Sequence, residues 1–344
     1  MLLVKWCFYL LSNGCAGNST ASRFNDRCML AGTVTARAEG LSNLRSCRSS
    51  ALARSGFSVP DTQAGSRSPH LNEGEQEQAA DHATPPALVV HEIVREEGEA
   101  AIGRTHSALF WSSLAAGLSM GFSFLMQAVL ESMLPENAWR APISGFGYTI
   151  GFVIVILGRQ QLFTESTLSV VLPVLTRRNL KTLRDALRVW AIVLAGNLVG
   201  TIVFAALLRV PGVFAPNVYK AFVTVAQAPY SGDFGVTMVR AIFAGWLIAL
   251  MVWLLPSARS ARLLTILLIT YVVAACKLSH VIAGAVEAMY AVFDGRHDLR
   301  DFVLVFFIPT LTGNVIGGMS LVALINHAAI APEIHGSDTP SNQH

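Results

Sequence analysis

Residues 141–175, APISGFGYTIGFVIVILGRQQLFTESTLSVVLPVL, decide how the fold of this chain is interpreted. The run is 35 residues long and mostly apolar, but Arg159 and Glu165 lie near its middle. One straight helix needs only about 20 residues to cross a bilayer, and a charge at mid-membrane costs about 2.5 kcal/mol or more. A continuous helix facing lipid is therefore excluded. The pattern predicts a broken helix whose break lies inside a bundle of other helices.

Residues 263–293 have the same character in the second half of the chain. This run is 31 residues long and largely apolar, yet it contains Lys277, Ser279, His280 and Glu287. Polar residues inside a run that is longer than one crossing predict a second broken helix.

Four other stretches are uncharged and long enough for a single crossing of the membrane, which needs about 20 residues. They are residues 108–130, 189–208, 241–258 and 302–325. Together with the two broken stretches they make six membrane segments.

Matching motifs follow the two broken stretches, Gly-Asn-Leu-Val-Gly at 196–200 and Gly-Asn-Val-Ile-Gly at 313–317. The chain therefore divides into two halves of three segments each, residues 108–208 and 241–325. Because three is an odd number, the second half must enter the membrane from the opposite side. The predicted fold is an all-α polytopic membrane protein with six transmembrane helices in two inverted three-helix repeats, helices 2 and 5 broken. Such repeats place a transport site at mid-membrane.

The composition agrees with a membrane protein. The chain of 344 residues is 53% hydrophobic and 14% charged, whereas an average globular chain is about one quarter charged. A soluble enzyme, a collagen and a disordered acidic chain are excluded on this basis. The net charge of +3 is too small to indicate a nucleic-acid partner. The five cysteines form no CxxC motif, so we expect no disulfide framework, no metal site and no cofactor.

The regions outside the membrane segments differ in composition. Residues 1–84 are an N-terminal extension that is disordered, is a targeting segment, or follows from a start codon assigned too early. Residues 85–107, opened by two prolines, are typical of a surface helix on the cytoplasmic side. Residues 108–326 form the membrane transport domain, and residues 327–344 form a polar C-terminal tail.

Basic residues in the connecting loops indicate the orientation. The loops at 176–188 and 256–262 hold seven Lys and Arg in 20 positions, whereas the loops at 131–141, 209–240 and 294–301 hold six in 51. The higher density of Lys and Arg favours a cytoplasmic location for the loops at 176–188 and 256–262. We therefore expect a multi-pass protein of the cell inner (plasma) membrane with both termini cytoplasmic.

Leu162-Phe163-Thr164 in the first break, His280 in the second, and the two Gly-Asn-x-x-Gly runs resemble the formate/nitrite transporter family. The resemblance covers about residues 108–326 in the same order and spacing. It implies six helices in an aquaporin-like arrangement and a ring of five protomers, a homopentamer in the lipid bilayer. Each protomer would have its own pore for a small monovalent anion such as formate, nitrite or hydrosulfide.

The resemblance also implies positions for the family's pore residues. The threonine and the central histidine would be Thr164 and His280. The hydrophobic constrictions would fall on Tyr148, Phe152, Leu162 and Phe163 on one side and on Val273 on the other.

Five positions depart from the family pattern. Arg159 and Lys277 stand where the family usually has glycine, and Gln161 and Ser279 stand where it usually has an acid. Gly284 replaces an asparagine. Each half has therefore gained a cation near its break and lost an acid.

The polar residues of the breaks have two interpretations each. His280 can donate a hydrogen bond to an anion, or lend it a proton, or it is satisfied by a neighbouring carbonyl. Arg159 and Lys277 either supply positive potential that attracts an anion or pair with Glu165 and Glu287.

The remaining candidates lie beside the breaks. Thr164 either offers its hydroxyl to the permeating ion or caps the half-helix that follows it. Asn197 and Asn314 lie on long helices, so we favour a structural role in which they bind backbone groups freed by the breaks.

Two other function classes stay open. Gly117-Leu-Ser-Met-Gly121 matches the G-x-S-x-G pattern of serine hydrolases, and His280 would be the base of an intramembrane serine-type hydrolase. That chemistry needs a strand–turn–helix context, whereas these residues lie within an uncharged membrane segment. A membrane scaffold that recruits partners through residues 71–105 is the other alternative. Transport by a protein that is not an enzyme is the favoured interpretation.

Overall fold

The computed structural model of the chain describes residues 70–324 and 326–330, which fall in the second of two units, residues 1–62 and 63–344. Within these described ranges the regular structure is helical and includes no strand. The all-α class predicted from the sequence is confirmed for this region. The expectations for residues 1–69 and 331–344 lie outside the described residues.

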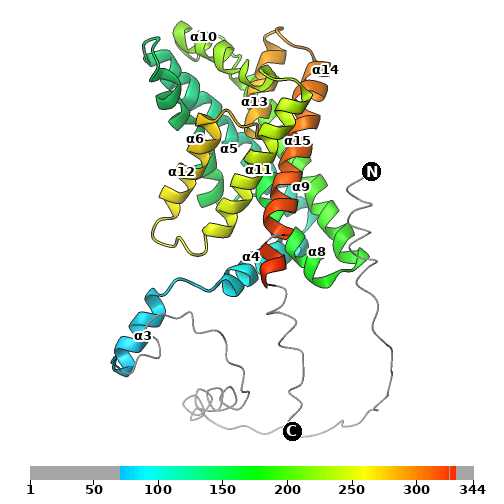
Figure 1. The fold of residues 1–344 in the computed structure, drawn as a ribbon. Helices are drawn as coiled ribbons and strands as arrows, with labels where there is room; N and C mark the ends of the chain where they lie inside the picture. Colours follow the sequence, from blue (N-terminus) through cyan, green and yellow to red (C-terminus); the bar gives the residue numbers. More distant parts are fainter. Residues whose placement is uncertain (1–69, 325, 331–344) are drawn as a thin grey trace, which may run out of the picture. The chain divides into compact units, whose positions relative to one another are not determined.

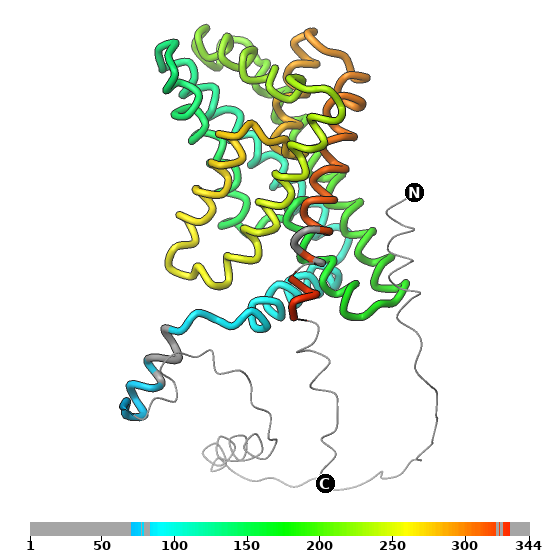
Figure 2. The backbone as a smooth tube through the Cα atoms, viewed as in Figure 1, coloured from blue at the N-terminus to red at the C-terminus, as the bar shows by residue number. Residues whose placement is uncertain are grey.

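Five helical stretches of the described region are long and apolar enough to cross a membrane. They are α5 (His106–Met133), α6 (Arg140–Leu157), α9 (Leu180–Leu207), α11 (Phe234–Leu254) and the stretch Leu299–Ser320. Helix α5 packs against α6 and α9, and α11 packs against the last stretch (Figure 1). The long helices therefore form one bundle, whose path is easiest to follow in the backbone tube of Figure 2.

The last membrane stretch is not a uniform α-helix. It contains α14 (Leu299–Asp301), the π-helix η2 (Phe302–Phe307), α15 (Ile308–Val315) and the π-helix η3 (Ile316–Leu324). The sequence does not predict these wider turns. They flank α15, which carries Asn314.

The two long apolar runs are broken where their polar residues lie. Helix α6 ends at Leu157, and α7 (Phe163–Ser169) begins after five residues that are not helical; α8 (Val171–Arg177) follows. In the second half, seven such residues separate α12 (Arg262–Ala275) from α13 (Ala283–Phe293). Each broken run therefore contributes two or more short helices in place of one long helix.

Two loops predicted from the sequence contain helices. Helix α9 begins at Leu180, nine residues earlier than expected, because the Asn179 side chain accepts the Thr182 N–H at 2.8 Å and caps the first turn. Most basic residues assigned to the 176–188 loop therefore lie on the first turns of α9. The expected loop at 209–240 contains α10 (Pro216–Val225), with proline at its start, and a short 3-10 helix η1 (Ala228–Tyr230).

Two helices precede the bundle in the chain. Helix α3 (Glu73–His82) lies within the segment 1–84 that the sequence analysis describes as an N-terminal extension. Asn72 and Glu75 stabilise its start, because each side chain accepts the other's backbone N–H at 2.9 Å. Helix α4 (Ala87–Gly103) follows Pro86 and contacts α7 and α8.

Glycines let the long helices approach closely. A Cβ atom added at Gly117 of α5 would lie 2.2 Å from the Asn197 carbonyl oxygen of α9. In the second half, a Cβ atom at Gly245 of α11 would lie 2.3 Å from the Asn314 carbonyl oxygen. Such contacts exclude any larger side chain and bring the two asparagines close to the breaks.

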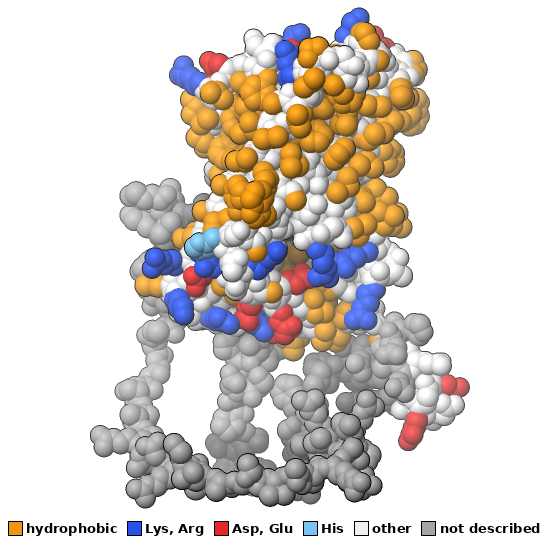
Figure 3. Space-filling model, turned by 180° about the vertical axis from the view of Figure 1, so that it is seen from behind, with side chains coloured by type: hydrophobic (Ala, Val, Ile, Leu, Met, Phe, Trp, Pro, Cys, Tyr) orange, Lys and Arg blue, Asp and Glu red, His pale blue; other side chains and the backbone are white. Residues whose placement is uncertain are grey.

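The outer surface of the bundle carries many apolar side chains. Figure 3 shows them over the upper part of the molecule, above a belt of charged side chains. Large exposed examples are Trp111, Phe146 and Leu268, each more than half exposed. An apolar surface of this kind indicates contact with lipid or with other subunits.

We predict that Gly117→Ala destabilises the protein by about 1–3 kcal/mol, because the new methyl group overlaps the α9 backbone. Thermal unfolding in detergent measures the effect. Gly103→Ala is the matched control, since nothing lies within 4 Å of a Cβ atom at that position. Equal unfolding temperatures for the two variants would contradict the close packing of α5 and α9.

Candidate functional site

The first break is held by the side chain of Asn197 on α9. Its Oδ1 accepts the backbone N–H of Phe163, the first residue of α7, at 2.9 Å. Its Nδ2 donates to the carbonyl oxygens of Ser113 at 2.7 Å and of Gln161 at 3.0 Å. One buried amide therefore satisfies backbone groups on both sides of the break and ties them to α5.

The second break is held in the same way by Asn314 on α15. Its Oδ1 accepts the N–H of Val281 at 2.9 Å, and its Nδ2 donates to the carbonyls of Ala241 at 2.8 Å and Ser279 at 2.9 Å. The residues bound in the two breaks are 118 positions apart, since 281 − 163 and 279 − 161 both equal 118. The two halves thus use equivalent contacts in one register.

Thr164 and His280 meet at the centre of the bundle, one from each break. The Thr164 Oγ1 and the His280 Nε2 are 2.8 Å apart, and each residue is only 1% exposed. The His280 Nδ1 accepts the backbone N–H of Ala283 at 3.1 Å. Because Nδ1 is an acceptor, the neutral imidazole carries its hydrogen on Nε2 and donates to Thr164. The Thr164 hydroxyl hydrogen has no acceptor among the described residues and stays available to a ligand.

Apolar side chains surround this pair. The Phe152 ring meets the His280 ring edge-on with centroids 5.0 Å apart, and the Tyr148 ring lies 5.4 Å from that of Phe152. The five residues that the resemblance assigns to constrictions are all buried in one core cluster: Tyr148, Phe152, Leu162, Phe163 and Val273. The Thr164–His280 pair is therefore enclosed by a largely apolar wall.

Trp190 of α9 fixes the start of α7. Its Nε1 donates to the Ser166 carbonyl at 3.0 Å, and its ring lies 5.9 Å from that of Phe163. This contact orients the helix that carries Thr164.

A cavity of about 570 Å³ opens on one side of this wall. Helix α4, the first break and the turn between α11 and α12 line it, and Leu162 forms part of its inner wall. Its charged side chains are Arg104, Arg159, Arg259, Arg262, Glu97 and Glu165. We call this cavity the vestibule. Four cations against two acids give the vestibule an excess of positive charge.

Sequence reasoning did not assign most of these vestibule residues to the site. The sequence uses Arg259 and Arg262 only as indicators of orientation, and it predicts that α4 is a surface helix. Helix α4 reaches the vestibule because Glu99 pairs with Arg177 at 2.9 Å and the Ile102 carbonyl accepts from Arg188 at 2.5 Å. No motif spacing links these residues, so only the fold brings them together.

Arg159 and Lys277 have the same unusual backbone conformation. Their φ angles are 50° and 51°, in the left-handed region that favours glycine. This explains why glycine is usual at both positions in the resembled family, because another residue there costs about 1–2 kcal/mol. Both side chains are exposed, and within the described ranges neither forms an ion pair with Glu165 or Glu287. The paired arrangement considered from the sequence is therefore not observed.

The structure also gives a reason why glycine, and not asparagine, occupies position 284. A Cβ atom at this position would lie 2.8 Å from the Phe306 ring of η2. The ring occupies the space that an asparagine side chain would need.

The family model described as Formate/nitrite transporter matches residues 88–328. The chain belongs to the formate/nitrite transporter family. This membership confirms the resemblance that Leu162-Phe163-Thr164 and His280 indicated, and it makes the protein a membrane protein of a family of transporters.

Two relatives illustrate the range of similarity. The inner membrane protein YfdC of Escherichia coli (strain K12) is 38% identical over 244 residues, which cover 71% of this chain and 79% of the relative. The formate channel BtFdhC of Bacillus thuringiensis is 24% identical over 239 residues, which cover 68% of this chain and 91% of the relative.

Solved structures share the fold. A pentameric formate channel with formate bound superposes with a TM-score of 0.53 at 18% identity, covering 66% of this chain and 98% of that one. An FNT family ion channel superposes with a TM-score of 0.55 at 22% identity, covering 71% and 96%.

We predict that Arg159→Gly and Lys277→Gly each raise the stability of the protein by about 1 kcal/mol, because glycine adopts the left-handed conformation without strain. Thermal unfolding in detergent measures the change. Arg184→Gly is the control, because this exposed residue lies within α9, where glycine is expected to cost about 1 kcal/mol. A loss of stability in both break variants would mean that the side chains hold the breaks.

Proposed function

We propose that this chain forms a membrane pore for small monovalent anions of weak acids, with formate and nitrite as the expected type. The observation that carries the proposal is the Thr164–His280 pair, a hydrogen-bond donor site enclosed by apolar side chains. A permeating anion would accept a hydrogen bond from the Thr164 hydroxyl. When the anion displaces that hydroxyl from His280, it would also accept a hydrogen bond from the His280 Nε2–H. An apolar wall with few donors suits a small anion and excludes a large polar solute.

The membrane architecture that we propose has six spans in two inverted three-helix repeats, arranged as in aquaporins. Helices α6, α7 and α8 make the broken second span, and α12 and α13 make the broken fifth. The equivalent bonds of Asn197 and Asn314 support this pairing of the halves. With three spans in each half, both termini lie on one side of the membrane, and the basic residues at the end of α8 and on the first turns of α9 favour the cytoplasm.

We propose that five copies assemble into a ring in the inner (plasma) membrane. The solved formate channel with the same fold is described as pentameric. Apolar side chains on the outer surface of this bundle suit both neighbouring subunits and lipid. Each protomer would carry its own pore, because the Thr164–His280 pair lies inside a single bundle.

Arg159 and Lys277 would face the two entrances of the pore. Arg159 lines the vestibule, and Lys277 holds the equivalent position at the second break. Their strained backbone is retained at two matching positions, which favours a role in attracting the anion. The proton transfer at His280 that the sequence suggested is one route past the apolar wall. It requires the Nδ1 atom to release the Ala283 N–H.

The hydrolase alternative has weaker support. Ser119 lies within the continuous helix α5, and Gly117 packs against the backbone of α9. A nucleophile elbow needs a sharp turn between a strand and a helix, so this pattern is a helix contact. A scaffold role for residues 71–105 is compatible with transport, although α4 serves as a wall of the vestibule. We therefore propose no catalytic residue.

The central prediction concerns flux. Wild-type protein in proteoliposomes should carry formate or nitrite, and Thr164→Val should lower this flux about tenfold because it removes one hydroxyl donor without changing shape. His280→Ala should lower it at least as strongly. Thr265→Val is the matched control, since Thr265 is only partly buried at the start of α12 and bonds its own helix. Wild-type flux in the Thr164→Val variant would remove Thr164 from the pathway.

A second prediction concerns orientation. A reporter inserted at residues 178–179, between α8 and α9, should be cytoplasmic, as should one fused after residue 330. A reporter inserted at residues 211–213, before α10, should be on the other side. An engineered cysteine can serve as the reporter at each position. Its labelling by an impermeant reagent in intact cells measures whether that position faces the outside. Labelling from outside at 178–179 would reverse the proposed orientation.

A further inference from the structure

The vestibule holds more cationic groups than a small monovalent anion can use. Its four arginines are Arg104, Arg159, Arg259 and Arg262. A single guanidinium is enough to neutralise one formate or nitrite ion. The volume of about 570 Å³ is also typical of a site for a small organic molecule. The proposed transport function therefore leaves most of this charge and most of this space without a role.

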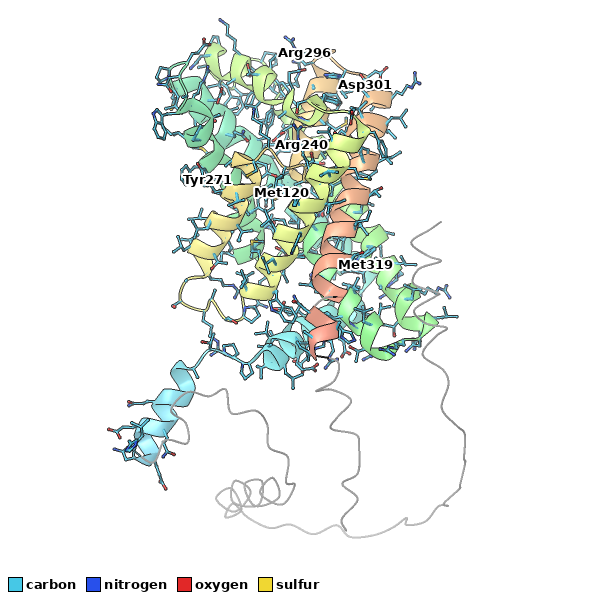
Figure 4. The ribbon with its side chains drawn as sticks, in the orientation of Figure 1. Met120, Arg240, Tyr271, Arg296, Asp301 and Met319 are labelled. Carbon is cyan, nitrogen blue, oxygen red and sulfur yellow. The ribbon has the colours of Figure 1, made fainter. Side chains whose placement is uncertain are left out.

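The four arginines come from separate parts of the bundle. Arg104 follows the last turn of α4, and Arg159 lies in the first break. Arg259 lies in the turn between α11 and α12, and Arg262 begins α12. Figure 1 shows α4 and this turn at the same end of the bundle, whereas Arg296, labelled in Figure 4, lies at the other end. The fold thus gathers one group of arginines around the vestibule.

None of the four vestibule arginines forms an ion pair within the described ranges. Arginines elsewhere do, as Arg177 does with Glu99 and Arg140 with Glu131. The Nε of Arg262 is also buried and has no hydrogen-bond partner in this part of the chain. A guanidinium without a carboxylate partner can bind an anion, and its planar fork suits the oxygens of a phosphate.

Two oxygen atoms of vestibule residues lack partners as well. Gln160 Oε1 and Glu165 Oε1 are buried, and neither has a hydrogen-bond partner among the described residues. Both residues line the cavity together with Glu97. A buried polar atom without a partner is costly, so a ligand that brings hydroxyl groups to these oxygens recovers a lost hydrogen bond. The cavity therefore offers both cationic donors and oxygen acceptors.

A phosphate monoester matches this combination. It has a charge of about −1.5 to −2 at neutral pH and three acceptor oxygens, so several guanidinium groups can bind it together. Glu97 and Glu165 repel the phosphate itself and favour its position beside the arginines. Their oxygens can accept from hydroxyl groups on the rest of the ligand. A dianion of this size does not cross the apolar wall that begins at Leu162, because it would lose its hydration there.

We propose that the vestibule is a binding site for a phosphate monoester and that the bound ligand closes the pathway from that side. Leu162 forms part of the inner wall of the cavity and precedes Phe163 and Thr164 in the first break. An occupant of the cavity therefore lies across the route to the Thr164–His280 pair. Binding does not depend on transport, whereas the closure rests on the proposed function. The phosphate belongs either to a soluble metabolite or to a lipid headgroup, and both present the same chemistry to the arginines.

Binding is tested first, by calorimetry on full-length protein in a neutral detergent, with glucose 6-phosphate and inorganic phosphate as probes. The wild type should bind glucose 6-phosphate more tightly than inorganic phosphate and should not bind glucose. Arg259→Gln and Arg262→Gln should each weaken the binding by about tenfold, because each removes charged hydrogen-bond donors to the phosphate. Arg184→Gln is the matched control, since this exposed arginine of α9 lies outside the vestibule. Thermal unfolding establishes that each variant is folded.

A second titration with short-chain phosphatidic acid distinguishes the two sources of phosphate. Binding of phosphatidic acid, but of neither soluble probe, would assign the site to a lipid headgroup if Arg262→Gln weakens it. The proposal would be overturned if the wild type bound none of these phosphates. It would also be overturned if the Arg259 and Arg262 variants bound them as tightly as the wild type.

Closure is tested by formate flux in phosphatidylcholine proteoliposomes with glucose 6-phosphate on both sides of the membrane. The wild-type flux should fall as the probe saturates its site, and Arg262→Gln should need about ten times more probe for the same inhibition. Unchanged flux at saturation would overturn the closure. Absence of formate flux without any phosphate would instead contradict the proposed function, and the binding measurements would still decide whether the site exists.

Discussion

The structure depends on two buried amide side chains that hold two breaks in the chain. A helix interrupted inside a membrane leaves backbone N–H and C=O groups without partners, and no water is present to satisfy them. Asn197 and Asn314 each bind one N–H and two carbonyls, which span the break and a neighbouring helix. Glycines at 117 and 245 let the backbones come close enough for these bonds.

The functional site follows from this constraint. Because the asparagines hold each break, the helix does not continue through it. The residues beside the break therefore lie at the centre of the bundle. Thr164 and His280 come from different breaks and different halves, yet their side chains meet at 2.8 Å. Arg159 and Lys277 are the second residues of the two non-helical segments, and both have a left-handed backbone.

Much of this was predictable from the sequence. Charged residues inside overlong apolar runs predicted the two breaks, and Gly-Asn-x-x-Gly spacing singled out both asparagines. The vestibule was not predictable, because Arg104, Arg259 and Glu97 come from separate elements with no shared motif. The early start of α9 was missed because capping by Asn179 outweighs the basic residues that suggested a loop. The π-helical turns beside Asn314 have no signature in hydrophobic periodicity.

Hydrogen–deuterium exchange of the wild type and of Asn314→Leu tests the central claim most directly, because leucine keeps the approximate shape of the side chain and removes its polar atoms. We predict that exchange becomes faster at the Val281 amide and its neighbours in the second break, while the Phe163 amide in the first break keeps its wild-type protection. Wild-type protection of Val281 in the variant would contradict the account, because the break would then be held by something other than Asn314.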